Sequence, residues 1–224
     1  MTTKEQDKAK SARQRYLAVL PVIVIVLGGA YLVGEYGLPF DSLLRNMQRQ
    51  AETIDTQEKW AEHIELPGLP NFHKVSDDLY RGAQPSSEGM KQLEKIGIKT
   101  VVNLRSSHSD RDELQGTSLA YEHIEMTAWG KPENEDVLRF LQIVSDGNSL
   151  PVFVHCQHGA DRTGTMCAIY RIIIQGWSKD EAIEEMTKGG FGFHSIWRSL
   201  PDYIRKLDIE EIKRSVGLDI PQTN

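Results

Sequence analysis

The chain has 224 residues, a formal net charge of −6 and two cysteines. This acidic balance argues against a nucleic-acid partner, because nucleic acids bind basic surfaces. Two cysteines cannot form the disulfide framework of a small secreted domain, and no cluster of histidine and cysteine has the spacing of a metal site, so no metal or other cofactor is expected. Cys167 lies among apolar residues and is expected in the core.

The N-terminal residues have the pattern of a membrane anchor. Residues 1–16 are polar and contain several basic side chains, whereas residues 17–34 contain no charge. About 18–20 such residues span a bilayer as a helix. The positive-inside rule therefore predicts a cytoplasmic tail at residues 1–16, a single transmembrane helix at residues 17–36, and an extracytoplasmic, periplasmic location for the remainder.

A cleaved signal peptide is the alternative interpretation of the same residues. Gly28, Gly29 and Ala30 are small enough to suit a signal peptidase. The apolar run is long for a signal peptide, however, and continues beyond these residues through Tyr31–Val33. This continuation favours an uncleaved anchor.

Residues 37–65 are predicted to form a juxtamembrane helical stalk. Their apolar residues recur at roughly helical spacing, at Leu44, Met47, Ala51, Ile54 and Trp60. A homodimer through this stalk stays open but has no support, because the pattern is short and impure for a coiled coil. The prolines and glycine that follow it would break any helix, so a separate folded domain is predicted at residues 66–224.

Strand and helix patterns alternate along this domain, which has the usual size for a single core. Strands are expected at residues 79–80, which form an edge hairpin with Val75, and at residues 100–104, 121–126 and 152–155. Helices are expected at residues 87–96, at residues 132–144 with proline in the first turn, from about 161 to 175, after a Ser178–Glu181 capping box, and from residue 200 onward. The alternation predicts an α/β sandwich with a central, mostly parallel sheet flanked by helices.

The strongest chemical signal is the segment Pro151–Gly164, in which an apolar strand runs into a glycine-containing loop that opens a helix. Such a loop can form a cup whose backbone N–H groups converge on one anion, and the helix N-terminus adds its positive dipole end. The residues expected around the phosphate are Gln157, His158, Gly159, Ala160, Asp161 and Arg162. The segment therefore predicts a phosphate site with a thiol, Cys156, at its base.

The residue types fit phosphoryl transfer to sulfur. Thiols beside a cation and a helix N-terminus lose their proton readily, so Cys156 is the expected nucleophile. Arg162 offers a planar fork of donors for two phosphoryl oxygens. Gly159 lets the backbone approach the anion, His155 is expected to anchor the loop from behind, and Thr163 is expected to hydrogen-bond the thiolate.

This segment resembles the signature loop of the cysteine-dependent protein tyrosine and dual-specificity phosphatases, which has histidine, cysteine, two residues, glycine, two residues, arginine, and serine or threonine. Val75–Pro85 and Ile98–Arg105 are similar to the opening strands of compact bacterial dual-specificity-like members. The resemblance covers residues 66–215. It implies the phosphatase fold, a phosphorylated protein as substrate and a cysteinyl-phosphate intermediate.

The general acid is the point at which the sequence departs from this family. Members usually carry an aspartate on the loop after the strand expected at residues 121–126. The corresponding loop here, Thr127–Pro132, has no carboxylate. Glu133, Glu135 and Asp136 follow at once, but acids in the first turn of a helix are favoured by its dipole whatever the function.

Asp161 is the preferred candidate for the acid. It stands next to the signature arginine and resembles the aspartate inside the signature loop of myotubularin-like and Sac-type phosphatases, which is proposed as their acid. The alternative explanation is a loop residue that faces solvent or bonds to backbone N–H groups, so Glu133, Glu135, Asp136 and water stay open as the proton source.

The loop interior also indicates the substrate class. Related phosphatases that act on multiply phosphorylated inositols tend to line the cup with lysine or arginine, because extra phosphates need extra cations. Here the interior has no lysine and adds the Asp161 carboxylate, so phosphotyrosine, or phosphoserine and phosphothreonine, is expected. Two alternatives remain: a catalytically weak phospho-binding or scaffolding module, and a lipid-phosphate phosphatase.

Overall fold

The computed structural model describes residues 60–127 and 130–218. The predicted tail and transmembrane segment, and most of the predicted stalk, lie outside these residues. In the part of the chain that is described, no helix combines the length and the apolar character needed to cross a membrane.

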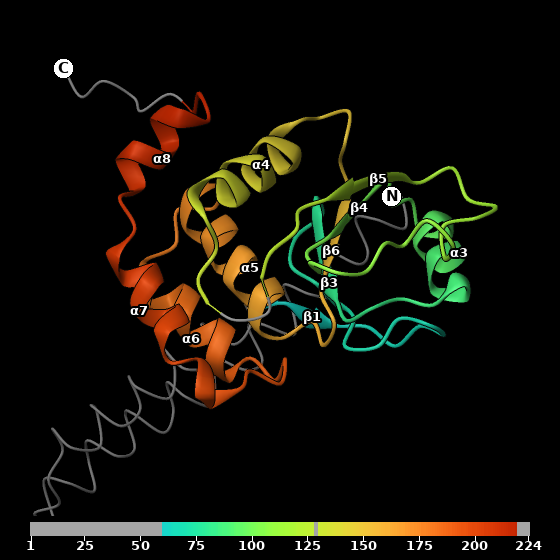
Figure 1. Ribbon diagram of the computed structural model, residues 1–224, viewed down its shortest axis with the longest axis horizontal. Coiled ribbons are helices and arrows are strands. Elements are labelled where there is room, and N and C mark those ends of the chain that lie inside the picture. The colour runs from blue at the N-terminus through green and yellow to red at the C-terminus, as the bar shows by residue number, and fades with distance from the viewer. Residues whose placement is uncertain (1–59, 128–129, 219–224) are drawn as a thin grey trace, which may run out of the picture. The chain divides into compact units, whose positions relative to one another are not determined.

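A six-stranded sheet in the order β1-β2-β3-β6-β4-β5 forms the centre of the domain (Figure 1). The strands are β1 (Glu62–His63), β2 (His73–Lys74), β3 (Leu79–Gly82), β4 (Thr100–Asn103), β5 (Ala120–His123) and β6 (Val152–His155). Pairing is antiparallel from β1 to β3 and parallel from β3 through β6 and β4 to β5. The predicted α/β fold is confirmed. The sheet is mixed, and its parallel strands include β6, which leads into the loop of Cys156.

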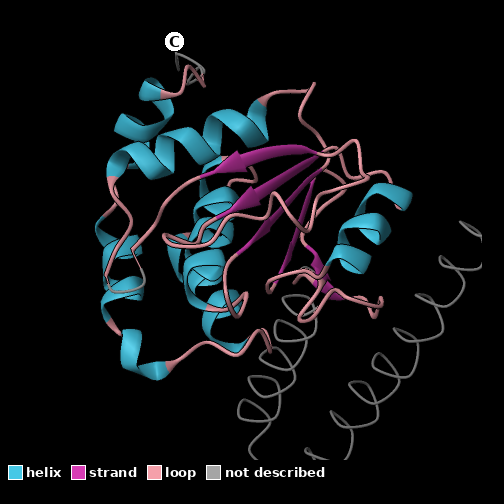
Figure 2. Cartoon of the chain, turned by 45° about the vertical axis from the view of Figure 1, so that its right-hand side comes forward, coloured by secondary structure: helices cyan, strands magenta, loops and turns pink. Residues whose placement is uncertain are grey.

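Helices cover both faces of the sheet (Figure 2). They are α3 (Ser87–Lys95), α4 (Asn134–Ser145), α5 (Asp161–Ile173), α6 (Lys179–Lys188), α7 (Ser199–Lys206) and α8 (Ile209–Ser215), with a short 3₁₀ helix, η1, at Ser195–Trp197. Helix α3 packs on one face, and α4 and α5 pack on the other together with α6 and α7.

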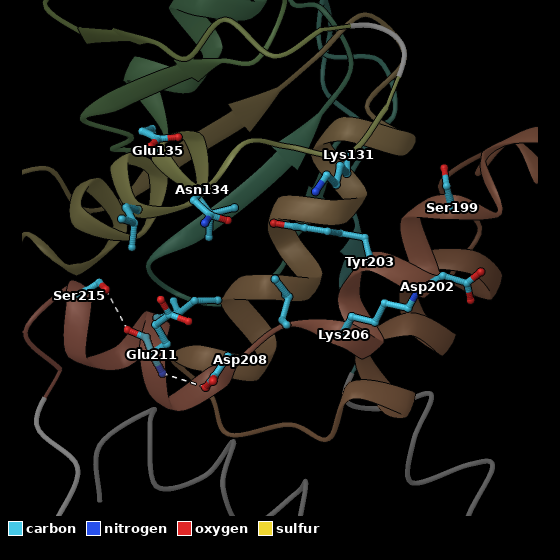
Figure 3. A pocket seen from close by; sticks show the side chains of 14 residues that line it. Lys131, Asn134, Glu135, Ser199, Asp202, Tyr203, Lys206, Asp208, Glu211 and Ser215 are labelled. Atoms are coloured by element: carbon cyan, nitrogen blue, oxygen red, sulfur yellow. Dashed lines mark hydrogen bonds between the residues drawn. The ribbon is translucent and has the colours of Figure 1, made fainter.

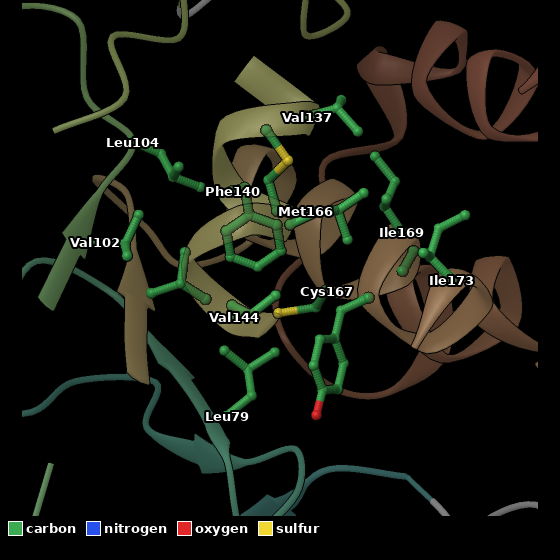
Figure 4. Packing of buried hydrophobic residues seen from close by; sticks show 14 of the residues in the cluster. Leu79, Val102, Leu104, Val137, Phe140, Val144, Met166, Cys167, Ile169 and Ile173 are labelled. Atoms are coloured by element: carbon green, nitrogen blue, oxygen red, sulfur yellow. The ribbon is translucent and has the colours of Figure 1, made fainter. Parts of the chain in front are cut away.

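Strand β6 shows why the sheet is buried on both sides. Its side chains alternate, so that Val152 and Val154 join the large core beneath α4 and α5, whereas Phe153 joins the smaller core beneath α3. All four of its residues are buried. A continuous apolar run of this kind is typical of a central parallel strand, as the sequence predicts. Figure 4 shows the larger core, to which Val102 of β4, Phe140 of α4 and Met166 of α5 all belong.

Two expectations about the strands need correction. Strand β5 pairs over Ala120–His123 rather than over residues 121–126, because its partner β4 ends at Asn103 and offers no further pairing beyond the hydrogen bond from Ile124 N to Asn103 O. The β2–β3 hairpin is not at the edge of the sheet. Strand β1 covers its outer side, and β3 is an interior strand between β2 and β6.

The helix N-termini follow local sequence signals. At α6, Ser178 Oγ accepts a hydrogen bond from Glu181 N, and the Glu181 carboxylate accepts one from Ser178 N, which confirms the predicted capping box. At α4 the cap is Glu133, whose N–H donates to the Asp136 carboxylate. Pro132 therefore precedes the helix instead of lying in its first turn.

Helices α5 and α6 are joined by a buried ion pair. Arg171 and Glu185 are 3% and 2% exposed. Arg171 Nε donates to Glu185 Oε2 over 2.8 Å, and Nη1 donates to the carbonyl of Val75. The other carboxylate oxygen of Glu185 also accepts a hydrogen bond from Ala61 N, close to β1. Removing one partner would leave the other charge buried without compensation.

We therefore expect Glu185→Gln to lower the free energy of unfolding by about 3–5 kcal/mol, the typical cost of breaking a buried pair. Urea titration monitored by circular dichroism measures the free energy of unfolding. Glu184→Gln on the same helix is the matched control, since Glu184 pairs with Lys188 at the exposed surface and should cost about 0–1 kcal/mol. Equal losses in the two variants would show that the buried pair has no special structural role.

Candidate active site

The loop that carries Cys156 lies between β6 and α5, at the carboxyl end of the central strand. Strand β6 ends at His155, and α5 begins at Asp161. Parallel neighbours on both sides of β6 leave this end of the sheet open for a ligand, as in other open α/β sheets. The backbone of the loop therefore meets the N-terminus of α5 where an anion would bind.

Gly159 fixes the path of this loop. Its φ is +69°, and a Cβ at this position would lie 2.4 Å from the carbonyl of Gly82 and 2.6 Å from Ala83 N, at the end of β3. Only glycine fits such a close approach in this conformation. Arg81 Nη2 donates to the Gly159 carbonyl over 2.8 Å, so β3 also holds the loop by a hydrogen bond.

Arg81 is itself buried, with an exposed fraction of 1%. Its guanidinium carbon lies 3.7 Å from the centre of the Phe191 ring, which stabilises the cation by its π face. The segment after α6 thus supports the loop through Arg81. Nothing in the local sequence around Arg81 indicates this role, because its partners are distant along the chain.

Behind the loop, His155 and Asp110 form a fully buried pair. His155 Nε2 lies 2.7 Å from Asp110 Oδ2, and Gln84 Nε2 donates to Asp110 Oδ1 over 2.8 Å. Desolvation raises the pKa of Asp110, but the hydrogen bonds from His155 and Gln84, together with the electrostatic interactions with His155 and His108, outweigh it and hold that pKa below its usual value. Asp110 is therefore an ionised anchor for the histidine that precedes the nucleophile, a partner that sequence analysis missed.

Cys156 and Arg162 line one cavity of about 440 Å³. Cys156 is 3% exposed. Arg162 Nη1 donates to the carbonyls of Leu104 and Met126 over 3.1 and 3.3 Å, and its other nitrogens make no hydrogen bond within the described residues. The guanidinium is thus oriented by the ends of two neighbouring segments while part of its donor fork stays available to an anion.

The wall of this cavity is partly apolar. Ile196, Trp197 and Leu200 line it from η1 and the start of α7, and Ile196 is one of the large apolar side chains that the described surface exposes, at 76%. Arg105 contributes a second cation to the lining. A ligand with an anionic head and a flat apolar body matches this combination.

Thr163 does not make the hydrogen bond expected from the sequence. Its side chain is fully buried, but Oγ1 has no hydrogen-bond partner among the described residues, the sulfur of Cys156 included. Support for the loop comes instead from Arg81 and from the His155–Asp110 pair.

Of the four carboxylates considered for the acid, Asp161 alone lines the Cys156 cavity. Glu133 and Asp136 are engaged in the N-terminal cap of α4. Desolvation raises the pKa of Asp136, with smaller effects from its neighbours. Glu135 lines a different cavity. The structure therefore places Asp161 near the thiol and leaves the three acids of α4 outside that cavity.

That second cavity, of about 730 Å³, lies between α4, α7 and α8 and is the larger of the two (Figure 3). Tyr203 reaches into this cavity, and Lys131 Nζ lies 5.9 Å from the centre of its ring. Burial raises the pKa of Tyr203 to about 12. No cysteine lines it. By volume alone this cavity would be taken as the active site, but the smaller cavity holds Cys156 and Arg162.

One group of side chains in the described residues has the geometry of a metal site. The ligand atoms of His108, Asp110 and Glu113 lie within 4.8 Å of one another. Asp110 already accepts hydrogen bonds from Gln84 and faces His155. The group is therefore explained by the network that anchors His155, and a metal would compete with that network for Asp110.

Comparisons with known proteins agree with this geometry. Residues 67–199 match the family described as "DSP-PTPase phosphatase fused to NAD+ Kinase". The dual specificity protein phosphatase TpbA of Pseudomonas aeruginosa is 32% identical over 203 residues, which cover 90% of this chain and 86% of TpbA. The inositol diphosphatase DSP5 of Arabidopsis thaliana is 28% identical over 128 residues, covering 53% of this chain and 61% of DSP5.

A solved structure extends the comparison to the fold. The crystal structure of a cysteine-to-serine variant of P. aeruginosa TpbA, in complex with phosphotyrosine, matches with a TM-score of 0.64 and 31% identity. The match covers 72% of this chain and 98% of that one.

The close approach at Gly159 can be tested by substitution. Gly159→Ala would bring a Cβ against the backbone of Gly82 and Ala83, so we expect it to lower the stability and to weaken phosphate binding at least tenfold. Gly176→Ala is the matched control, because Gly176 has a similar φ of +73° but nothing within 4 Å of its would-be Cβ. It should cost only about 1–2 kcal/mol of backbone strain and leave phosphate binding intact. Thermal unfolding and calorimetric phosphate titration measure both, and equal behaviour of the two variants would contradict the argument.

Proposed function

Because the chain belongs to the DSP-PTPase phosphatase family and is a dual-specificity-type phosphatase, we propose that it removes phosphate from phosphotyrosine in proteins, with phosphoserine and phosphothreonine as further substrates. The observation that supports this most is that Cys156 and Arg162 line one cavity with an apolar wall. A tyrosyl ring can pack against Ile196 and Trp197 while its phosphate reaches the thiol. The phosphotyrosine bound to the TpbA variant supports the same substrate class.

The reaction proceeds through a cysteinyl phosphate. The Cys156 thiolate attacks phosphorus, the bond between phosphorus and the ester oxygen breaks, and the leaving oxygen receives a proton from an acid at the Asp161 end of the cavity. Arg162 and the N–H groups of the loop hold the equatorial oxygens as charge shifts onto them. Water then attacks phosphorus and gives a proton to the same group, which now acts as a base; the sulfur–phosphorus bond breaks, inorganic phosphate leaves and the thiolate is restored.

An inositol polyphosphate is the second substrate to consider, since DSP5 is named an inositol diphosphatase. The lining of the cavity does not favour it. Its permanent cations are Arg105 and Arg162, no lysine of the described residues lines it, and Asp161 adds a negative charge beside them. A ligand with several phosphates needs more cations than this cavity offers.

Residues 17–36 are proposed to anchor the enzyme in the membrane as a single-pass helix, with the catalytic domain in the periplasm. The support is the sequence itself: an uncharged run of bilayer length that follows a basic tail. No described residue bears on this proposal, which therefore rests on the charge pattern alone.

We expect Cys156→Ser in the full-length chain to abolish turnover of phosphotyrosine peptides while retaining phosphate binding, because a serine hydroxyl is a far weaker nucleophile than a thiolate. Cys167→Ala is the matched control. Burial raises the pKa of Cys167 to about 11, so this thiol stays protonated in the core and should be dispensable for turnover.

The measurements are steady-state hydrolysis of phosphotyrosine peptides, phosphoserine peptides, phospholipids and inositol polyphosphates, and mass spectrometry of rapidly quenched enzyme. Wild type should acquire one phosphoryl group, and Cys156→Ser none. Turnover that persists in pure Cys156→Ser protein would overturn the mechanism. Phosphate binding without turnover in wild type would favour a phospho-binding module, and faster hydrolysis of phospholipids would favour a lipid-phosphate phosphatase.

The topology predicts that reporters fused after Phe40 are active when they work only outside the cytoplasm, and that the full-length protein sediments with membranes and resists alkaline extraction. Replacing the basic residues of the tail by glutamine should reduce this orientation preference. If a reporter that works only in the cytoplasm is the active one at this junction, the orientation is wrong. Recovery of a soluble, shortened chain would indicate a cleaved signal peptide.

A further inference from the structure

The acid of this site needs a separate explanation, because the loop at Thr127–Pro132 has no carboxylate. Asp161 is the carboxylate that lines the Cys156 cavity, yet both of its oxygens are engaged. Oδ1 accepts a hydrogen bond from His194 N over 3.0 Å, and Oδ2 lies 2.7 Å from His194 Nδ1. A carboxylate held in this way is placed to accept hydrogen bonds rather than to give a proton to an ester.

His194 lines the same cavity as Cys156 and Arg162. Its side chain is half exposed, whereas that of Asp161 is 17% exposed, so the imidazole is more accessible to a bound substrate than the carboxylate is. Nδ1 is the ring nitrogen that meets Asp161, and Nε2 has no hydrogen-bond partner among the described residues. A carboxylate bound to one ring nitrogen of a histidine, with the other ring nitrogen unpaired in the cavity that holds the nucleophile, is an arrangement in which the carboxylate can orient the histidine for proton transfer.

We propose that His194 is the general acid of this phosphatase, and that Asp161 is a positioning residue that holds its ring. The inference rests on the proposed function, since it concerns the same reaction at Cys156. It replaces Asp161 as the proton donor and keeps it at the site. In the imidazolium form both ring nitrogens carry hydrogen, so Nδ1 donates to Asp161 and Nε2 is left to serve the substrate.

The proton balance is complete within the site. As the Cys156 sulfur bonds to phosphorus and the ester bond breaks, His194 Nε2 gives its proton to the leaving tyrosyl oxygen and becomes neutral. In the second step the neutral Nε2 takes a proton from the attacking water. The sulfur–phosphorus bond breaks, phosphate leaves, and both the thiolate and the imidazolium are restored.

His158 is the other histidine of the cavity, and its ring centre lies 5.5 Å from that of His194. No carboxylate of the described residues contacts its ring. Its main chain carbonyl accepts a hydrogen bond from Asn71, which fixes the loop but does not orient the imidazole. His158 therefore provides a matched comparison within the same cavity.

His194→Asn separates the two candidate acids. The asparagine Nδ2 can replace Nδ1 as the donor to Asp161, so the carboxylate stays in place while the group that gives the proton is lost. In the full-length chain we expect this variant to hydrolyse a phosphotyrosine peptide about 10²–10⁴-fold more slowly, the usual contribution of a positioned acid. Hydrolysis of 2,4-dinitrophenyl phosphate, whose oxygen departs without a proton, should slow by less than about tenfold.

Three further variants test whether His194 gives the proton while Asp161 holds its ring. Asp161→Asn should slow the phosphotyrosine peptide in the wild-type background but add little to His194→Asn, because it acts through the imidazole. His194→Gly should regain peptide hydrolysis when imidazole is added, which a purely structural role would not predict. The ratio of the rate on 2,4-dinitrophenyl phosphate to the rate on the phosphotyrosine peptide measures the leaving-group dependence. His158→Asn should keep the leaving-group dependence of wild type.

The outcomes distinguish this inference from the function on which it rests. If His194→Asn keeps the wild-type leaving-group dependence while Asp161→Asn steepens it, Asp161 is the acid and the inference is wrong. If His158→Asn alone steepens it, the acid is His158, which also overturns the inference. Failure of the proposed function would instead appear as no turnover of either ester by wild type, or as turnover that survives Cys156→Ser.

Discussion

The loop that carries Cys156 depends on buried charged side chains that hold it from two directions. Arg81 donates to the carbonyl of Gly159 on the β3 side, and the His155–Asp110 pair fixes the loop where it leaves β6. In a loop that gathers N–H groups around an anion, the partial positive charges of those groups converge on one point. They repel one another when no anion is bound, so the loop needs such support when the site is empty. Buried hydrogen bonds to charged groups supply it more strongly than neutral ones.

Burying these charges costs desolvation free energy, and the fold offsets it by pairing each of them. Arg81 contacts the Phe191 ring, Asp110 is bonded by Gln84 and His155, and Arg171 pairs with Glu185 in the core between α5 and α6. Such pairs add less stability than apolar side chains of similar size would. Around Cys156 these pairs orient the loop backbone, which apolar packing alone would not do.

The sequence predicts this structure best where the signal is local. Apolar runs identify β4 and β6, Ser178 and Glu181 mark the start of α6, and the loop from Cys156 to Arg162 identifies the phosphate site. The strand β1 has only two residues, Glu62–His63, within the predicted stalk, and pairs only because β2 offers an edge. Its formation depends on tertiary contacts, which a pattern of apolar residues does not report.

Most of the site beyond the loop could not be found in this way. Asp110 and Arg81 are far in sequence from the residues that they anchor, and each alone looks like an ordinary surface charge. The acid shows the same limit. The sequence selects Asp161 as the preferred carboxylate, but it gives no sign that the fold brings His194 to Asp161 from beyond α6.

The position of Asp161 at the first turn of α5 has a consequence for how the proton donor works. Asp161 and Cys156 belong to one continuous loop and helix, so a histidine held by this carboxylate keeps its place relative to the thiol. An acid on a separate loop has to close over the substrate before it can act. In the arrangement proposed here the donor is preorganised by two hydrogen bonds to one side chain, and the ordering cost is met when the chain folds rather than when substrate binds. The segment around His194 then determines both the acid and, through Ile196 and Trp197, the apolar wall of the cavity, so that leaving-group chemistry and substrate fit are coupled in one stretch of chain.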